Sequence, residues 1–218
     1  MTIWIDAACI LVVFFSLSIL AAYRIGGMIQ MFAVQSLVLS FMPVLMHSHA
    51  LSLRDILLSL GTMVLKAVLV PYILFWAIRH VSMRSEVKPI IGIGSSIVCG
   101  ALLIAGSFWV SSSVTFPGKI ASDLVIPCSL ATVLLGFMIM VTRTRAVTQV
   151  VGYLVMENGI FLFALSLFDA MPILIEMGIL LDIFAAVFIM AIVVNHINEE
   201  FERSPAAVKR WSKMGESI

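Results

Sequence analysis

Seven long apolar segments constrain this chain more than any other feature of its sequence. Each is about 20 residues long, the length that an α-helix needs to cross the hydrocarbon core of a bilayer. Of the 218 residues, 62% are hydrophobic and 11% are charged, whereas a soluble domain carries about 25% charged residues. The sequence therefore predicts an all-α integral membrane protein with about seven transmembrane helices. The segments are Ile3–Ala22, Met28–Met46, Asp55–Ile78, Ile90–Val110, Ser122–Thr142, Gln149–Phe168 and Ile173–Asn195.

The positions of lysine and arginine predict how these spans are oriented. With seven spans, two of the 13 basic residues, Arg54 and Lys119, fall on the side of the N-terminus. Ten fall on the opposite side, and the remaining one, Lys66, lies inside the third span. Short cytoplasmic loops carry the excess of basic residues. We therefore expect the N-terminus outside and the C-terminus in the cytoplasm.

Four of the spans place a polar residue near the middle of the membrane. They are Gln35 in the second span, Lys66 in the third, Glu157 in the sixth and Asp182 in the seventh. A charge at the bilayer centre costs about 2.5–3.5 kcal/mol even on the most lenient scale, so we expect these groups to face one another or a partner. Burial and neighbouring opposite charges can together let such groups gain and lose a proton near neutral pH, which a proton relay requires. The alternative is a static ion pair of Lys66 with Glu157 or Asp182.

Two further polar residues complete the candidate site. Asn158 follows Glu157 directly, and Glu176 lies one turn inside the outer end of the seventh span, where it could also simply reach water. We expect proton transfer at four residues, with Gln35 and Asn158 as supporting polar groups. The four are Glu157, Asp182, Lys66 and Glu176.

Other chemistry finds little support in the sequence. The three cysteines are far apart and form no CxxC pair, so we expect small buried hydrophobic residues rather than a metal or redox site. The His47-x-His49 pair has no acidic or cysteine neighbour to complete a metal site. No nucleophile–base pair is recognisable, and the net charge of +1 gives no reason to expect nucleic-acid binding. We predict no cofactor, no metal and no catalytic site in this chain.

The first three and the last three spans follow the same plan. In each set, an apolar span and a basic loop precede a span with a central polar residue, and a span with a central charge follows. The fourth span would then connect two three-helix units. We predict an N-terminal unit over residues 1–80, a connector over 90–110, a C-terminal unit over 122–197 and a cytoplasmic tail over 198–218.

The stretches VVGYLVMENGIFLFAL and IEMGILLDIFAAVFIMAIVVNHI resemble the second and third helices of complex I subunit K. They also resemble its counterpart in multisubunit sodium/proton antiporters. In that family a helix reading Gly-Leu-Glu-x-x-x-Asn precedes a helix with one central acid. Alignment on Gly152 and Asn158 puts the family's glutamate at Leu154, whereas this chain has Glu157 one turn further along nearly the same face. Asp182 matches the second acid directly.

Over its full length the chain is similar to the hydrogenase-4 component E family. The shared features are a length near 220 residues, LKAVLVPYI around Lys66, the MENG motif at 156–159, and the E-x-G-x-x-x-D pattern that ends at Asp182. The resemblance implies a non-redox subunit in the membrane arm of a group 4 membrane-bound [NiFe] hydrogenase, where it contributes to proton or sodium translocation.

This resemblance also implies partners and a location. The partners would be antiporter-like subunits, a protein similar to membrane component H of complex I, the hydrogenase arm, and membrane lipids. The location would be a bacterial inner membrane or an archaeal cytoplasmic membrane, crossed several times. Two alternatives stay open from the sequence: a subunit of a multisubunit cation/proton antiporter, and a structural spacer of a membrane arm that conducts nothing.

Overall fold

The computed structural model describes residues 2–46, 53–80, 91–113 and 122–166, and these residues are helical apart from short turns. The all-α prediction is therefore confirmed over this part of the chain. The helices are α1 (Thr2–Ala21), α2 (Ile25–Ser40), α3 (Met42–Met46), α4 (Leu53–Thr62), the π-helix η1 (Met63–Leu69), α5 (Val70–His80), α6 (Ile93–Ser113), α7 (Val125–Thr142) and α8 (Ala146–Ser166).

Six stretches of the described residues are long and apolar enough to cross a membrane. They coincide with the first six predicted spans, with ends that differ by a few residues. The predicted seventh span, Ile173–Asn195, lies outside the described residues, so the total of seven and the orientation stay predictions. The six stretches are Thr2–Ala21, Ile25–Met46, Ser59–Trp76, Ile93–Ser113, Val125–Thr142 and Ala146–Ser166.

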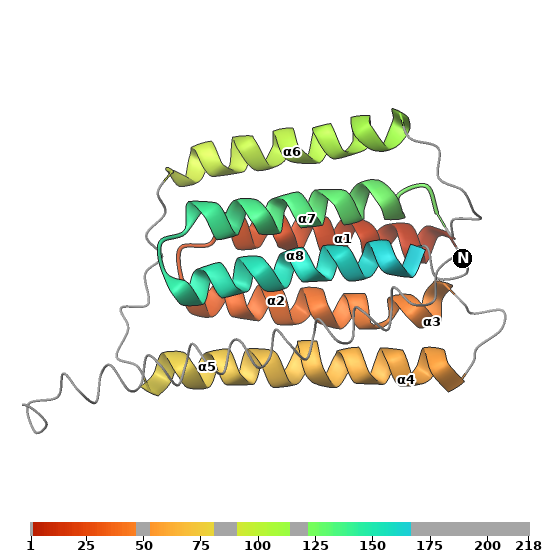
Figure 1. Cartoon of the computed structure of the whole chain (residues 1–218), viewed down its shortest axis with the longest axis horizontal. Helices are drawn as coiled ribbons and strands as arrows, with labels where there is room; N and C mark the ends of the chain where they lie inside the picture. The colour runs from red at the N-terminus through yellow and green to blue at the C-terminus, as the bar shows by residue number, and fades with distance from the viewer. Residues whose placement is uncertain (1, 47–52, 81–90, 114–121, 167–218) are drawn as a thin grey trace, which may run out of the picture.

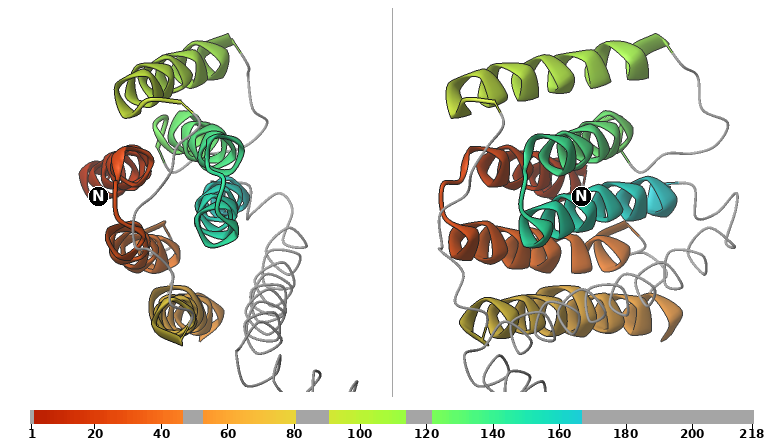
Figure 2. Two further views of the ribbon diagram at one scale, coloured as in Figure 1. Left: turned by 90° about the vertical axis from the view of Figure 1, so that its left-hand side faces the viewer. Right: turned by 60° about the vertical axis from the view of Figure 1, so that its left-hand side comes forward.

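Four helices form the centre of the described structure (Figure 1). The hairpin α1–α2 packs against the hairpin α7–α8, with α1 beside α7 and α2 beside α8. Helix α6 lies outside this group against α7 and α1. The helix made of α4, η1 and α5 lies on the opposite side, against α2 (Figure 2). Residues buried on several faces are therefore found mainly on α1, α2, α7 and α8.

The interior of this central group consists of two apolar clusters. The first cluster lies toward the α1–α2 and α7–α8 turns, and the second lies toward the other end of the same helices. The first is built around Ile19, Leu20, Ile29, Phe32, Leu135, Ile139, Val151 and Leu154. The second is built around Ile5, Cys9, Val12, Leu39, Met42, Cys128, Phe161 and Leu162.

Buried polar residues separate the two clusters on every central helix. On α1, Ser16 follows Val12 and precedes Ile19, and on α8, Glu157 and Asn158 lie between Val155 and Phe161. Gln35 and Ser36 hold the same place on α2, as do Ser129 and Thr132 on α7. We call these residues, together with Lys66 of η1, the polar layer. It crosses the bundle near the middle of the candidate spans.

The cysteine expectation holds only in part. Cys9 and Cys128 are buried together in the second cluster, but Cys99 is exposed on α6. The reason is that α6 lies outside the central group, and only a narrow face of it reaches the other helices. Ser96 and Gly100 are on that face, and the Cβ of an alanine at Gly100 would approach Leu17 and Leu20 to 2.9 Å.

Three glycines bring α7 and α8 into backbone contact. A Cβ placed on Gly136 would collide with the backbone of Met156, and one on Gly152 would lie 2.7 Å from the backbone nitrogen of Met140. A Cβ on Gly159 would lie 2.7 Å from the backbone nitrogen of Val133. Small residues allow such close approach between membrane helices. These glycines fix the distance between α7 and α8, and so the position of the polar residues on α8.

We predict that Gly136→Val destabilises the protein, because the valine side chain has no room against the α8 backbone. The loss in unfolding free energy should be at least about 1–3 kcal/mol, the range for overpacked interiors. The matched control is Gly106→Val on α6, where an added Cβ meets nothing within 4 Å. Unfolding in mixed micelles, followed by circular dichroism, measures both variants. Equal losses in the two would contradict the close packing of α7 on α8.

Candidate functional site

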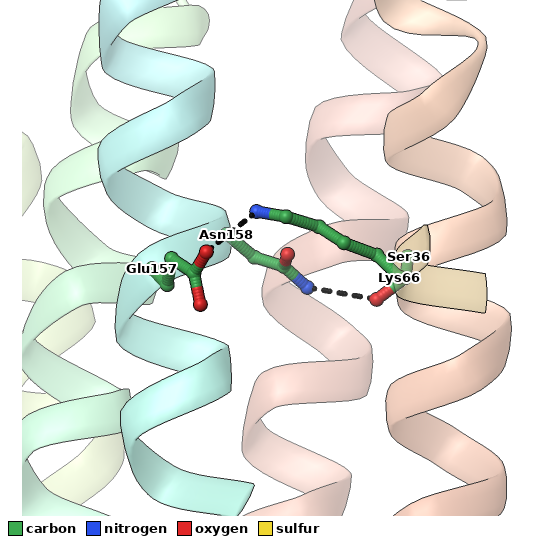
Figure 3. Close-up of polar contacts among 4 residues, drawn as sticks. All are labelled: Ser36, Lys66, Glu157 and Asn158. Carbon is green, nitrogen blue, oxygen red and sulfur yellow. Dashed lines mark hydrogen bonds and ion pairs between the residues drawn. The ribbon is translucent and has the colours of Figure 1, made fainter. Parts of the chain in front are cut away.

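An ion pair joins η1 to α8 inside the polar layer (Figure 3). The Nζ atom of Lys66 lies 3.4 Å from Oε1 of Glu157. The two side chains are only 5% and 3% exposed. Both residues lie well inside candidate membrane spans, Ser59–Trp76 and Ala146–Ser166. Lys66 therefore faces one of the membrane-centre acids, Glu157, whereas Asp182, the other candidate partner, lies outside the described residues.

Lys66 lies in the middle of the π-helical turn η1. The backbone N–H of Val70 bonds to the carbonyl of Leu65, five residues earlier, as a π-helix requires. Pro71 follows, and a proline inside a helix has no N–H and clashes with the carbonyl four residues before it. In a membrane helix, a local π adjustment is one way to satisfy the backbone groups that a proline frees. Sequence reasoning predicted one unbroken helix here and missed this turn.

The ring of Phe161 forms a second contact for the lysine. The Lys66 ammonium lies 5.1 Å from the ring centroid, a distance at which the ring face attracts a cation. Phe161 comes four residues after Glu157, so the carboxylate and the ring occupy one face of α8. The ammonium therefore contacts two groups that lie one helical turn apart on the same helix.

Asn158 and Ser36 link α8 to α2 beside this pair. Nδ2 of Asn158 donates a hydrogen bond of 3.1 Å to Oγ of Ser36 (Figure 3). Asn158 is fully buried and Ser36 is 1% exposed. Because successive residues on an α-helix point about 100° apart, Glu157 and Asn158 serve two different neighbours, η1 and α2.

Gln35 extends the polar layer from α2 to α1. Its Nε2 donates hydrogen bonds of 2.7 Å to Oγ of Ser16 and 3.1 Å to the carbonyl of Val12. Gln35 and Ser36 are neighbours in sequence, so they too face different helices, α1 and α8. Ser16, Gln35, Ser36, Asn158, Glu157 and Lys66 thus form a series of buried polar contacts across α1, α2, α8 and η1.

Two amide oxygens in the polar layer can still accept hydrogen bonds. Within the described residues, Oε1 of Gln35 and Oδ1 of Asn158 accept no hydrogen bond from the protein. Buried polar atoms in proteins almost always bond to protein or to ordered water. These two amide oxygens can therefore accept further hydrogen bonds inside the bundle.

The structure brings together four of the six residues singled out from the sequence. Lys66, Glu157, Gln35 and Asn158 lie in the polar layer on three elements. Asp182 and Glu176 lie outside the described residues, so their place in the site stays a prediction.

Sequence reasoning missed Phe161 and four hydroxyl residues of the layer, which are Ser16, Ser36, Ser129 and Thr132. Ser16 and Ser36 were overlooked because serines are common in membrane helices and bond to their own backbone, as Ser16 also does to the carbonyl of Val12. Phe161 was overlooked because phenylalanine is ordinary in an apolar span. The spacing of four residues from Glu157 was the available signal.

The described residues contain no group of three His, Cys, Asp or Glu side chains arranged to hold a metal ion.

A buried arginine marks the turn between α7 and α8. Arg143 is 1% exposed, and its Nη2 donates to the carbonyl of Leu20 near the end of α1. Its own carbonyl accepts a hydrogen bond of 2.9 Å from Nε2 of Gln149. Burial lowers the pKa of the Arg143 guanidinium. A cation near the C-terminal end of a helix is stabilised by the helix dipole, so Arg143 ties α1 to the α7–α8 turn.

Six apolar helices around a buried ion pair define a multi-pass membrane protein that holds charged residues inside its helix bundle. Comparison with known proteins gives relatives below one-third identity. The chain is 27% identical over 166 residues to hydrogenase-4 component E of Escherichia coli strain K12, with 76% of this chain and 77% of that protein covered. The component of the same name in Shigella flexneri matches equally well.

A further relative comes from Mycobacterium tuberculosis. It is an uncharacterized protein, 25% identical over 187 residues, with 84% of this chain and 85% of the relative covered. No family model matches the chain. No solved structure matches it either.

We predict that Lys66 and Glu157 are energetically coupled. Removing one partner of a buried ion pair costs about 3–5 kcal/mol because it leaves an uncompensated charge. Lys66→Met and Glu157→Gln should therefore each destabilise the protein, and the double variant should lose clearly less than the sum of the two. A double-mutant cycle of unfolding free energies measures this coupling. Additivity to within about 0.3–0.5 kcal/mol would mean that the residues do not interact.

Proposed function

We propose that this protein is a non-redox membrane-arm subunit of a membrane-bound [NiFe] hydrogenase or a related complex I-like assembly. In that assembly it contributes to proton translocation through the polar layer. It supplies no catalytic site of its own, and its partners are the antiporter-like subunits, the protein similar to membrane component H of complex I, and the hydrogenase arm.

The observation that carries the proposal is the Lys66–Glu157 pair. Two ionisable groups near the middle of candidate membrane spans are expensive, and such groups commonly mark ion pathways and proton relays. A pair that served only to hold helices together could be replaced by apolar residues of similar volume at little cost. A carboxylate next to an ammonium, in contrast, can take up and release a proton.

The similarity to hydrogenase-4 component E supports the choice of assembly. It covers about three quarters of both proteins, so it includes most of the described spans. A subunit of a larger complex also agrees with a site built from an ion pair and amides. The E-x-G-x-x-x-D pattern that ends at Asp182 supports the same choice.

In this function Glu157 takes up and releases the proton, and the side-chain amides of Asn158 and Gln35 support its transfer. A proton that arrives on Glu157 neutralises the carboxylate and weakens its attraction for Lys66. Release of the proton restores the pair. Asn158 and Gln35 hold water molecules on the α2 side of the pair through their open amide oxygens, and Asp182 and Glu176 continue the path in the predicted seventh span.

We predict that the protein co-migrates with a nickel–iron hydrogenase subunit and iron–sulfur proteins. The experiment is gentle detergent extraction of native membranes, a native gel, and mass spectrometry of the band that contains this chain. Co-migration with antiporter subunits alone would move the assignment to a cation/proton antiporter. Migration of the chain by itself would contradict both assignments.

We predict that Glu157→Gln abolishes proton translocation while the complex still assembles. Glutamine keeps the shape of the side chain but cannot exchange a proton, so uptake into inverted vesicles should fall at least about 100-fold, the lower end of what one proton-transfer group contributes. The matched control is Asp123→Asn, an exposed acid just before α7, which should leave uptake unchanged. Normal uptake in an assembled Glu157→Gln complex would assign this subunit a purely structural role.

A further inference from the structure

Two buried side chains at one end of the bundle keep hydrogen-bond donors that the polar layer does not use. Nε and Nη1 of Arg143 have no hydrogen-bond partner within the described residues, although its Nη2 donates to the carbonyl of Leu20. The hydroxyl of Ser96 on α6 is also buried without a partner there, whereas Ser16 and Ser107 bond back to carbonyls of their own helices. Buried polar groups are almost always hydrogen-bonded, so we expect these donors to meet an acceptor from outside the described helices.

Both side chains lie around Leu20, close to the end of α1. Ser96 comes one turn before Gly100 on the same face of α6, and a Cβ on Gly100 would approach Leu20 to 2.9 Å. Arg143 directly follows α7 and reaches the carbonyl of Leu20. The start of α6, the end of α1 and the α7–α8 turn lie at the same end of the bundle (Figure 1). We call Ser96, Arg143 and the first turn of α6, residues 92–95, the arginine corner.

The N-terminus of α6 adds backbone donors to the arginine corner. The N–H of Ser96 bonds to the carbonyl of Gly92 at 2.9 Å, so the N–H groups of the three residues between them have no partner inside the helix. An added Cβ on Gly94 would meet nothing within 4 Å, so the backbone is open to a ligand at that position. Helix N-termini attract anions because the free N–H groups and the helix dipole both point at the ligand.

The charges at this end of the bundle also favour an anion. Arg24 lies in the α1–α2 turn and Arg145 in the α7–α8 turn, next to Arg143. Within the described ranges, no acid lies at this end, because three lie near the starts of α1, α4 and α7, at the opposite end, and one lies in the middle of α8. These acids are Asp6, Asp55, Asp123 and Glu157.

We propose that the arginine corner binds the phosphate group of an anionic phospholipid. The candidate spans Thr2–Ala21 and Val125–Thr142 end here and Ile93–Ser113 begins here, so the corner lies at the boundary between hydrocarbon and headgroups. A guanidinium can bind two phosphate oxygens at once. Arg143 has a long side chain at a helix end, which lets the guanidinium turn toward the headgroups.

The predicted orientation places this end at the cytoplasmic face, where basic sites between membrane helices bind anionic headgroups. In the bound state, the free donors of Arg143, the hydroxyl of Ser96 and the first N–H groups of α6 share the phosphate oxygens. The arginine corner is separate from the polar layer. This inference therefore does not depend on proton transfer at Glu157.

The test measures lipid binding to the purified full-length chain in a nonionic detergent by native mass spectrometry. Dioleoyl phosphatidylglycerol is titrated, and dioleoylglycerol, which has the same tails without the phosphate, is the comparison ligand. Arg143→Met should raise the Kd for phosphatidylglycerol at least about tenfold, because hydrogen bonds between charged groups are among the strongest. Binding of dioleoylglycerol should stay unchanged. Arg24→Met, which removes an exposed arginine at the same end, should change the Kd little.

A second variant tests the site without removing the buried arginine. Gly94→Val places a side chain over the open first turn of α6 and should weaken the binding of phosphatidylglycerol. Gly106→Val is equally open on the same helix but lies far from this end, so it should leave binding unchanged. Circular dichroism checks that both variants stay helical. Equal affinities in Gly94→Val and Gly106→Val would overturn the proposal.

Excess inorganic phosphate distinguishes the two sources of a phosphate group. If the ligand is a lipid headgroup, inorganic phosphate should not displace phosphatidylglycerol from the wild-type chain. Displacement that disappears in Arg143→Met would support the phosphate site and assign free phosphate as its ligand. Equal Kd values for phosphatidylglycerol and dioleoylglycerol, or equal losses in Arg143→Met and Arg24→Met, would overturn the proposal.

Discussion

In a lipid environment, every buried charge needs a partner within the protein, and this constraint organises the described structure. Lys66 satisfies it with Glu157 at 3.4 Å and with the ring of Phe161. The contact requires η1 and α8 to lie at a fixed distance and rotation. The helices on either side of the pair must therefore be placed accurately, and the apolar clusters and the close α7–α8 contact provide that placement.

The polar layer divides each central helix into two apolar halves. Residues such as Ile19 and Leu154 pack at one end, and Cys9 and Leu162 pack at the other. Apolar residues therefore flank the polar contacts toward both ends of the bundle. A surrounding of low polarity strengthens each electrostatic contact within the layer, and it raises the cost of leaving any member unpaired. The layer is consequently the place where a change in one proton has the greatest effect on neighbouring helices.

Much of the fold and of the candidate site could be predicted from the sequence, because a membrane-spanning chain carries strong signals: long apolar segments and the few charged residues inside them. Long apolar runs predicted six of the spans, and the cost of burying a charge predicted that the central polar groups face one another or a partner, without deciding that Lys66 pairs with Glu157. Asn158 was found through its place next to Glu157, and Gln35 through its depth. The π-helix around Lys66 was missed because a proline such as Pro71 is compatible with several local distortions of a helix. Ser16, Ser36 and Phe161 were missed because their residue types are ordinary in apolar helices, and only packing shows which face of the helix they occupy.

The central claim is that Glu157 gains and loses a proton as the complex works. Infrared difference spectroscopy of the assembled complex, recorded as it is driven by its reductant, observes the carboxyl group directly. The account predicts a carboxylic acid C=O band that changes during turnover, is lost in Glu157→Gln and shifts in Glu157→Asp. Identical difference spectra for the wild type and an assembled Glu157→Gln complex would contradict it.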